Sequence, residues 1–131
     1  MTRLIHIWSH EPLTRELLIK ARGAVMAAHP LVCANASIIT SDGYGLDVEI
    51  TCLCERLGVP VMVVGTGLKP SNNTSLRYYQ RVICPPRTPR YERAAIRDAW
   101  IRSQATDSVE LRTSDLEERP AHCLPVVQAW R

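Results

Sequence analysis

The chain has 131 residues, of which 46% are hydrophobic and 22% charged, and it carries a formal net charge of +3. This length supports one domain with a hydrophobic core of its own. The small net charge does not favour a protein devoted to nucleic acid, which usually has a densely basic face. The sequence lacks both a run of about 18 apolar residues and the apolar core of a signal peptide. We therefore expect a cytoplasmic protein without a membrane-spanning helix.

The first part of the chain alternates between strand-like and helix-like segments. Leu4–Trp8 is short, apolar and partly β-branched, which is typical of a buried strand. Apolar residues then recur at helical spacing from Leu13 to about His29, and Pro30 ends this predicted helix. A second strand is predicted at Ser37–Thr40.

The middle of the chain continues the alternation. A second helix is predicted at Leu46–Leu57, with Gly58 as its left-handed cap. Val59–Val64 predicts a third strand, apolar on both faces as parallel strands covered by helices tend to be. The polar residues of Gly65–Ser75 predict a loop, whereas Leu76–Cys84 has no clear pattern.

The last part of the chain predicts a helix at Arg90–Gln104, a short strand at Ser108–Arg112 and an edge strand at Leu124–Trp130. Strands alternating with helices predict an α/β fold, a single Rossmann-like domain with a mostly parallel sheet flanked by helices. We expect this domain to fill residues 1–131, with its core at about 4–111 and a C-terminal extension at 112–131.

Ligands of such sheets bind beyond the carboxyl ends of the strands, where the strand order reverses. Three predicted loops meet there, namely Ser9–Pro12, Ser41–Asp47 and Gly65–Lys69. The first two loops open helices, whose free N–H groups and positive dipole end favour an anion. The expected ligand-binding residues in these loops are Ser9, His10, Ser41, Asp42, Gly43, Tyr44, Gly45, Gly65 and Thr66.

The loop with the sequence SDGYGLDVE joins the second strand to the second helix. Gly43 and Gly45 permit positive φ angles and a close approach of ligand to backbone, and Tyr44 between them offers a ring for stacking. Asp47 is placed to cap the helix or to bind sugar hydroxyls, and Glu49 to act as a general acid or base. The alternative interpretation is a tight turn in which Asp47 is only a cap.

The order of these motifs resembles that of the SLOG superfamily of Rossmann-like proteins. This group includes the LOG-type cytokinin-activating phosphoribohydrolases and the DNA-processing protein A family. Its core is a strand, a glycine-rich turn that is often Gly-Gly-x-x-Gly-x-Asp, a helix, then Gly-Val/Ile-Pro and the next strand. Here Ser41–Asp47 (SDGYGLD) and Arg56–Val63 (RLGVPVMV) follow that order, and Tyr91–Trp100 (YERAAIRDAW) and Ala105–Val109 (ATDSV) resemble later segments of small members. The resemblance covers roughly Leu4 to Leu111.

The resemblance implies binding of a nucleotide or nucleotide-derived small molecule, with no further cofactor, by a homo-oligomer that we expect to be a dimer. Ser41 and Asp42 replace the glycine pair that usually begins the turn. The LOG signature Pro-Gly-Gly-x-Gly-Thr-x-x-Glu is also incomplete. Asp42 would place negative charge where a phosphate rests, so we expect either a nucleoside-like ligand or a phosphate held by Arg residues.

Charged residues of the third predicted helix have two interpretations. Arg93, Arg97 and Arg102 share helical spacing, and they either hold a phosphate bidentately or form a solvated face. Asp98 has the spacing to pair with Arg102.

The remaining aromatic and sulfur-containing residues are expected to be structural. His6 is predicted to be a structural strand residue, and Trp8 and Trp100 to be core anchors. The five cysteines are expected to be free thiols, and they are Cys33, Cys52, Cys54, Cys84 and Cys123. Without a CxxC pair or a zinc-type His/Cys spacing, no metal site is expected.

Three functions remain open from the sequence. The first is binding of a nucleotide-type molecule, which the partial glycine signature favours. The second is hydrolysis of an N-glycosidic bond, with Glu49 or Asp47 stabilising an oxocarbenium-like ribose and helping to activate water. The third is DNA binding by the Arg-rich surface, which the modest net charge disfavours.

Overall fold

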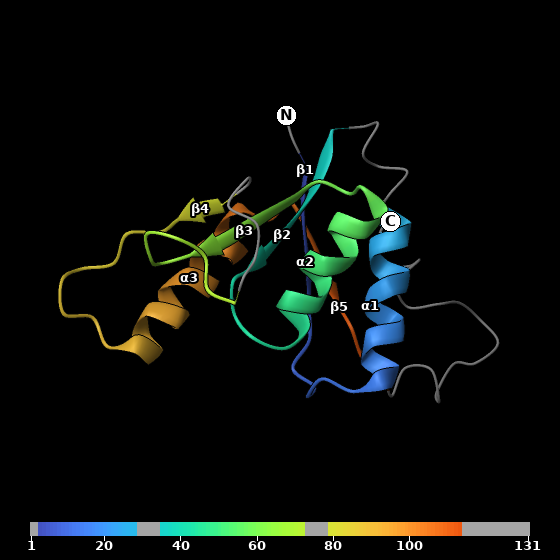
Figure 1. Cartoon of the computed structure of the whole chain (residues 1–131), viewed down its shortest axis with the longest axis horizontal. Helices are drawn as coiled ribbons and strands as arrows, with labels where there is room; N and C mark the ends of the chain where they lie inside the picture. Colours follow the sequence, from blue (N-terminus) through green and yellow to red (C-terminus); the bar gives the residue numbers. More distant parts are fainter. Residues whose placement is uncertain (1–2, 29–34, 73–78, 114–131) are drawn as a thin grey trace.

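The computed structural model describes residues 3–28, 35–72 and 79–113. These residues form one five-stranded parallel sheet flanked by three helices (Figure 1). The strands are β1 (Arg3–Trp8), β2 (Ala36–Ser41), β3 (Val61–Gly65), β4 (Tyr79–Arg81) and β5 (Asp107–Glu110). The helices are α1 (Arg15–Ala28), α2 (Leu46–Leu57) and α3 (Arg90–Gln104). The predicted α/β, Rossmann-like fold is thereby confirmed for this part of the chain.

The strand order is β4-β3-β2-β1-β5. Neighbouring strands are parallel, with Ile5 of β1 opposite Ile38 of β2 and Ile38 opposite Val61 of β3. The chain therefore progresses from β1 to β4 in one direction and returns to place β5 on the other side of β1. This reversal creates a switch point between β1 and β5, where α/β sheets usually bind ligands.

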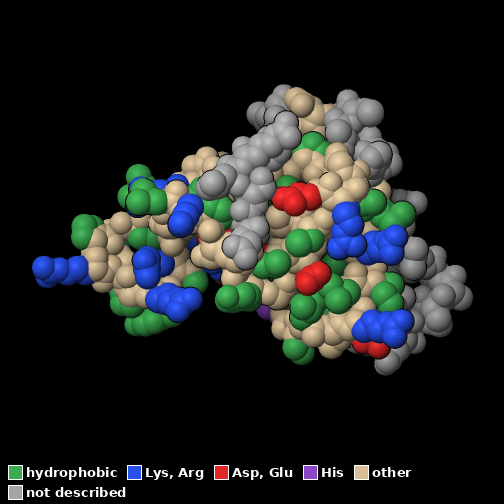
Figure 2. All heavy atoms as spheres, in the orientation of Figure 1, with side chains coloured by type: hydrophobic (Ala, Val, Ile, Leu, Met, Phe, Trp, Pro, Cys, Tyr) green, Lys and Arg blue, Asp and Glu red, His purple; other side chains and the backbone are tan. Residues whose placement is uncertain are grey.

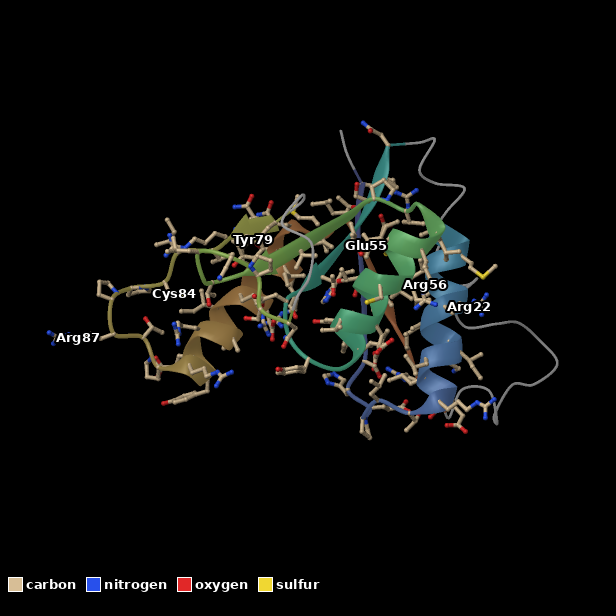
Figure 3. The ribbon with its side chains drawn as sticks, in the orientation of Figure 1. Arg22, Glu55, Arg56, Tyr79, Cys84 and Arg87 are labelled. Atoms are coloured by element: carbon tan, nitrogen blue, oxygen red, sulfur yellow. The ribbon has the colours of Figure 1, made fainter. Side chains whose placement is uncertain are left out.

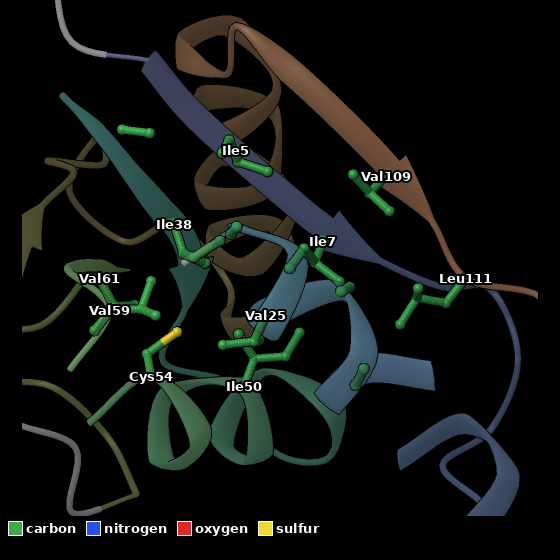
Figure 4. Packing of buried hydrophobic residues seen from close by; sticks show 14 of the residues in the cluster. Ile5, Ile7, Val25, Ile38, Ile50, Cys54, Val59, Val61, Val109 and Leu111 are labelled. Carbon is green, nitrogen blue, oxygen red and sulfur yellow. The ribbon is translucent and has the colours of Figure 1, made fainter. Parts of the chain in front are cut away.

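Two apolar clusters sandwich the sheet. Ile5 and Ile7 of β1 face α1 and α2, where they pack with Val25 and Ile50 (Figure 4). The helix α3 covers the opposite face (Figures 1 and 4). The smaller cluster on that face consists of Ile39, Val64, Val82 and Ile101. Burying side chains of this size stabilises the fold by about 1.5–3 kcal/mol each. Apolar packing therefore fixes the helices on both faces of the sheet.

Local signals account for the helix bounds. The predicted bounds of α2 and α3 are confirmed, and Gly58 ends α2 with φ 71° and its N–H bonded to the carbonyl of Cys54. The helix α1 begins at Arg15 rather than Leu13, because the Thr14 hydroxyl accepts the N–H of Leu17 as an N-terminal cap.

The strands β1 and β2 extend the predicted ranges by one residue at one end and at both ends, respectively, and two other predicted strands are shifted. The strand β3 begins at Val61 rather than Val59, because the N–H of Val59 still bonds to the end of α2 at Cys54. The strand β5 covers Asp107–Glu110 rather than Ser108–Arg112. The predicted strand at Leu124–Trp130 lies outside the described residues. Among the helices of the described ranges, none has the length and apolar character needed to cross a membrane.

Candidate functional site

Two adjoining hollows lie at the carboxyl end of the sheet. We name the first the aromatic hollow, which has a volume of about 720 Å³ and includes His6, Trp8, His10, Tyr44, Asp47 and Asp98. We name the second the basic hollow, which has a volume of about 420 Å³ and includes Gly43, Tyr44, Gly67, Arg90, Arg93 and Arg97. Tyr44 lines both hollows, and its side chain is 85% exposed. The two hollows therefore meet at the glycine turn.

The basic hollow receives its charge from α3. Arg90, Arg93 and Arg97 recur at i, i+3 and i+7, so they share one face of the helix. Arg90 and Arg93 are exposed and form no ion pair with the described residues. Figure 2 shows Lys and Arg side chains gathered over α3 and the loop before it. Their charges are therefore available to an anion.

Asp42 lines the basic hollow, but its charge is already balanced. Its carboxylate is 3.3 Å from Nη1 of Arg97 and accepts the N–H of Ser71 at 3.0 Å. Its carbonyl accepts a hydrogen bond from the Asn72 amide at 2.6 Å. Asp42 thus ties α3 and the loop after β3 to the end of β2.

Gly45 and Gly65 lie at this end of the sheet, and a side chain would be unfavourable at both, for different reasons. Gly45 has φ 84°, which a side chain would disfavour, and it is the residue at which the chain enters α2. A Cβ on Gly65 would collide with the Asp42 carboxylate and would lie 2.5 Å from the Tyr79 hydroxyl. That hydroxyl donates to the carbonyl of Gly67, so Tyr79 (labelled in Figure 3) holds the loop in place.

The aromatic hollow has a row of three rings from β1 and the loop that follows it. His6 and Trp8 alternate with the core residues Ile5 and Ile7, so they fall on the face that α3 covers, and His10 follows in the loop after β1. The Trp8 ring is 6.4 Å from the His6 ring at 23° and 4.7 Å from the His10 ring at 85°. The indole N–H donates to the hydroxyl of Ser108 at 2.7 Å, which fixes the plane of the ring.

The sequence predicts structural roles for Trp8 and His6, but both line the aromatic hollow. Trp8 is half-buried and lines the hollow, so the prediction that it is a core anchor is wrong. His6 also lines the hollow, and burial lowers the pKa of its imidazole although Asp98 raises it. The signal that reasoning from sequence missed is the period-two spacing of His6, Trp8 and His10, which continues from a strand into a loop.

Asp47 lies in the aromatic hollow but does not cap α2. The N-terminal cap is Gly45, which makes no side-chain hydrogen bond, and the Asp47 carboxylate instead accepts the hydroxyl of Ser41. The prediction of a cap is therefore wrong, because the end of β2 supplies a nearer partner. Burial raises the pKa of Asp47, and Asp98 adds to this effect while Ser41 and Arg97 oppose it.

Glu49 lines neither hollow. It is two residues beyond Asp47, or about 200° around the helix, so the two acids point to different sides of α2. The predicted pairing of Asp98 with Arg102 is also wrong, since Asp98 accepts Nε of Arg97 at 2.9 Å.

The remaining predicted ligand residues divide between the hollows. The basic hollow contains Asp42, Gly43, Tyr44, Thr66, Arg93 and Arg97, and the aromatic hollow contains Ser9, His10, Tyr44 and Gly45. Ser41 and Gly65 line neither. The Ser9 hydroxyl already donates to the carbonyl of Leu111 at 2.7 Å and accepts the N–H of Glu11 at 3.0 Å. Arg90 was missed by sequence reasoning, although its spacing to Arg93 and Arg97 was a usable signal.

The described ranges contain no candidate metal site, because no three or more His, Cys, Asp or Glu side chains in them are grouped so that they could hold an ion. Cys52, Cys54 and Cys84 are free thiols, while Cys33 and Cys123 lie outside those ranges. Comparison of the chain with family models, curated proteins and solved structures gives no match.

Proposed function

We propose that the protein binds a nucleotide or nucleotide-derived small molecule across the two hollows. Its anionic group occupies the basic hollow and its planar base the aromatic hollow. The observation that carries this proposal is the position of Tyr44, which lines both hollows and exposes its ring at their junction. A ligand that is charged at one end and planar at the other fits this pair of surfaces.

The basic hollow has three features that favour a phosphate. Guanidinium groups bind phosphate oxygens bidentately, and Arg90 and Arg93 are not engaged by acidic residues of the described ranges. Gly43 and Gly67 present backbone without side chains. The first turn of α3 follows Pro89 and has no side-chain cap, so its N–H groups and dipole add positive potential.

The aromatic hollow has features that favour a heterocycle. The His6 and Trp8 rings lie at 23° to each other and His10 stands edge-on to Trp8, and base–aromatic stacking contributes about 1–3 kcal/mol per base. Because burial lowers the pKa of His6, its ring presents an uncharged surface at neutral pH. The resemblance of the glycine turn to the SLOG superfamily supports the same class of ligand.

Titration calorimetry with nucleosides, nucleoside mono-, di- and triphosphates and inorganic phosphate tests this proposal. We expect at least one nucleotide to bind more tightly than its nucleoside and than phosphate alone, and Arg93→Ala to weaken that binding about tenfold. The matched control is Arg22→Ala on α1 (labelled in Figure 3), because Arg22 is exposed and lines neither hollow. The absence of any binder across the panel would refute the proposal.

Hydrolysis of an N-glycosidic bond is a second candidate, and the position of Asp47 favours it. This carboxyl lies in the aromatic hollow with a raised pKa, and a general acid that protonates a leaving base needs these properties. Release of free base from AMP or dCMP, followed by chromatography, tests for turnover. Asp47→Asn should abolish the release and Glu49→Gln should preserve it, whereas the opposite result would assign the chemistry to Glu49.

A further inference from the structure

Three polar groups of the aromatic hollow are engaged within the protein. The Glu11 carboxylate accepts the N–H of Thr113 at 3.0 Å and its hydroxyl at 2.5 Å. The Asp47 carboxylate accepts the Ser41 hydroxyl. The Trp8 indole N–H is used by Ser108. These three groups therefore already use hydrogen-bonding capacity within the protein.

Asp98 combines an oxygen that is not engaged by the described residues with a side chain that is open to solvent. Its Oδ1 accepts Nε of Arg97 at 2.9 Å, while Oδ2 accepts no hydrogen bond from the residues described. The side chain is 45% exposed, so a ligand can reach it. Its charge also acts on His6 of the aromatic row. Asp98 thus presents an open acceptor in the hollow that holds the rings.

Arg97 fixes the direction of this acceptor. Its Nη1 is bound to Asp42 of the basic hollow while its Nε is bound to Asp98 of the aromatic hollow. The Arg97 side chain is only 18% exposed, and its guanidinium is bound to both carboxylates. This arrangement restricts rotation of the Asp98 carboxylate. The open oxygen is therefore a preorganised feature of the site.

We propose, building on the nucleotide binding inferred above, that the aromatic hollow selects a base with an exocyclic amino group, whose N–H donates to Asp98. Cytosine and adenine carry such a group, whereas uracil and hypoxanthine carry an oxygen at the same position. An ionised carboxylate only accepts hydrogen bonds, so the oxygen of an oxo base would face it unpaired and repelled. Sites built to bond an N–H reject analogues that lack it strongly, because the protein group is then left unpaired.

Paired titrations of CMP against UMP and of AMP against IMP test the selection. In the unmodified protein we expect the amino base of each pair to bind at least about tenfold more tightly, the effect of one hydrogen bond to a charged group. Asp98→Asn should bring each ratio close to one, because an amide presents both an acceptor and a donor. Glu92→Gln is the matched control on the same helix, since Glu92 is exposed and lines neither hollow.

A modified ligand tests the same contact without changing the protein. N4,N4-dimethyl-CMP keeps the ring and the phosphate but has no amino N–H, so we expect it to bind as weakly as UMP. Equal affinities within both pairs, or a preference for the oxo bases, would overturn the selection while leaving nucleotide binding intact. A preference that persists in Asp98→Asn would overturn the role of this residue. Failure of every nucleotide to bind would instead refute the proposed function itself.

Discussion

Arg97 on α3 lies against Asp42 at the start of the glycine turn, with Nη1 3.3 Å from Oδ1 of the carboxylate. The Asp42 side chain is 6% exposed and that of Arg97 is 18% exposed, so water screens this pair poorly. Because Asp42 also holds the loop after β3 through Ser71 and Asn72, the contact joins three segments. The geometry of the basic hollow therefore depends on one ion pair between residues that are 55 positions apart.

Asp42→Ala should destabilise the fold, because it removes the more buried of the two carboxylates that pair with the half-buried Arg97 charge and leaves the N–H of Ser71 without the Asp42 acceptor. We expect the free energy of unfolding to fall by about 2–3 kcal/mol, which is less than the roughly 3–5 kcal/mol lost when a buried charge keeps no partner, because Asp98 still pairs with Arg97. Urea denaturation measures the change. The control is Asp107→Ala, which breaks the more exposed pair with Arg3 and should cost clearly less. Equal losses in the two variants would show that the burial of the Asp42 pair has no consequence.

Gly65→Ala should also destabilise the fold, by about 1–3 kcal/mol. The added Cβ would collide with the Asp42 carboxylate and the Tyr79 hydroxyl, and both groups are held by hydrogen bonds. Thermal unfolding measures the effect. Gly23→Ala is the matched control, because its Cβ enters open space on α1 and should stabilise the helix by about 0.5–1 kcal/mol. Two changes of the same sign would contradict the packing described here.

Asp47→Asn should change how stability depends on pH. Burial raises the pKa of Asp47 above its ordinary value of 3.8, so the folded state favours the protonated form. The stability linked to this group is complete below pH 3.8 and is lost as the pH rises through the raised pKa. Asparagine cannot ionise, so the variant should gain stability relative to the unmodified protein as the pH rises through that window.

Chemical denaturation of both proteins at a series of pH values measures this difference. The asparagine side chain of the variant retains an oxygen that accepts the Ser41 hydroxyl, so the comparison isolates the ionisation. Arg97 and Asp98 also act on the carboxyl, and they are unchanged in the variant. A stability difference that is constant across the pH range, or that shrinks as the pH rises, would contradict the raised pKa.

Elements with strong local signals could be predicted from the sequence, and contacts between distant segments could not. Gly58 and Pro89 mark the end of α2 and the start of α3, so both bounds were predicted correctly. The strand β4 was not, because only Tyr79 of its three residues is half-buried and no alternation is visible. The position of Asp47 depends on Ser41 at the end of β2, a contact that overrides the local preference for a cap.

The ion pairs of the site also show that local spacing could be predicted and distant contacts could not. Helical spacing predicted that Arg93 and Arg97 share a face, but the partner of Arg97 is Asp42, which follows another strand of the sheet. Spacing alone also suggested Arg102 as the partner of Asp98, whereas Arg97 pairs with Asp98 and with Asp42 at once. The ion-pair partners depend on which loops the sheet topology brings together. The periodicity of a single helix does not reveal these contacts.

Tyr44→Ala should weaken nucleotide binding without affecting the fold. The ring is 85% exposed, so its removal deletes little buried surface, and we expect the free energy of unfolding to change by less than about 0.5 kcal/mol. Loss of one stacking partner should nevertheless lower the affinity for a nucleoside monophosphate about tenfold, because Tyr44 borders both hollows. The affinity for inorganic phosphate should be unaffected, since phosphate needs only the Arg residues.

Tyr91→Ala is the matched control for Tyr44→Ala, because Tyr91 is 74% exposed and lines neither hollow. Titration calorimetry of both variants separates a specific role from a general effect of removing an exposed ring: an equal loss of affinity in the two would remove Tyr44 from the site, and with it the reason for treating the hollows as one.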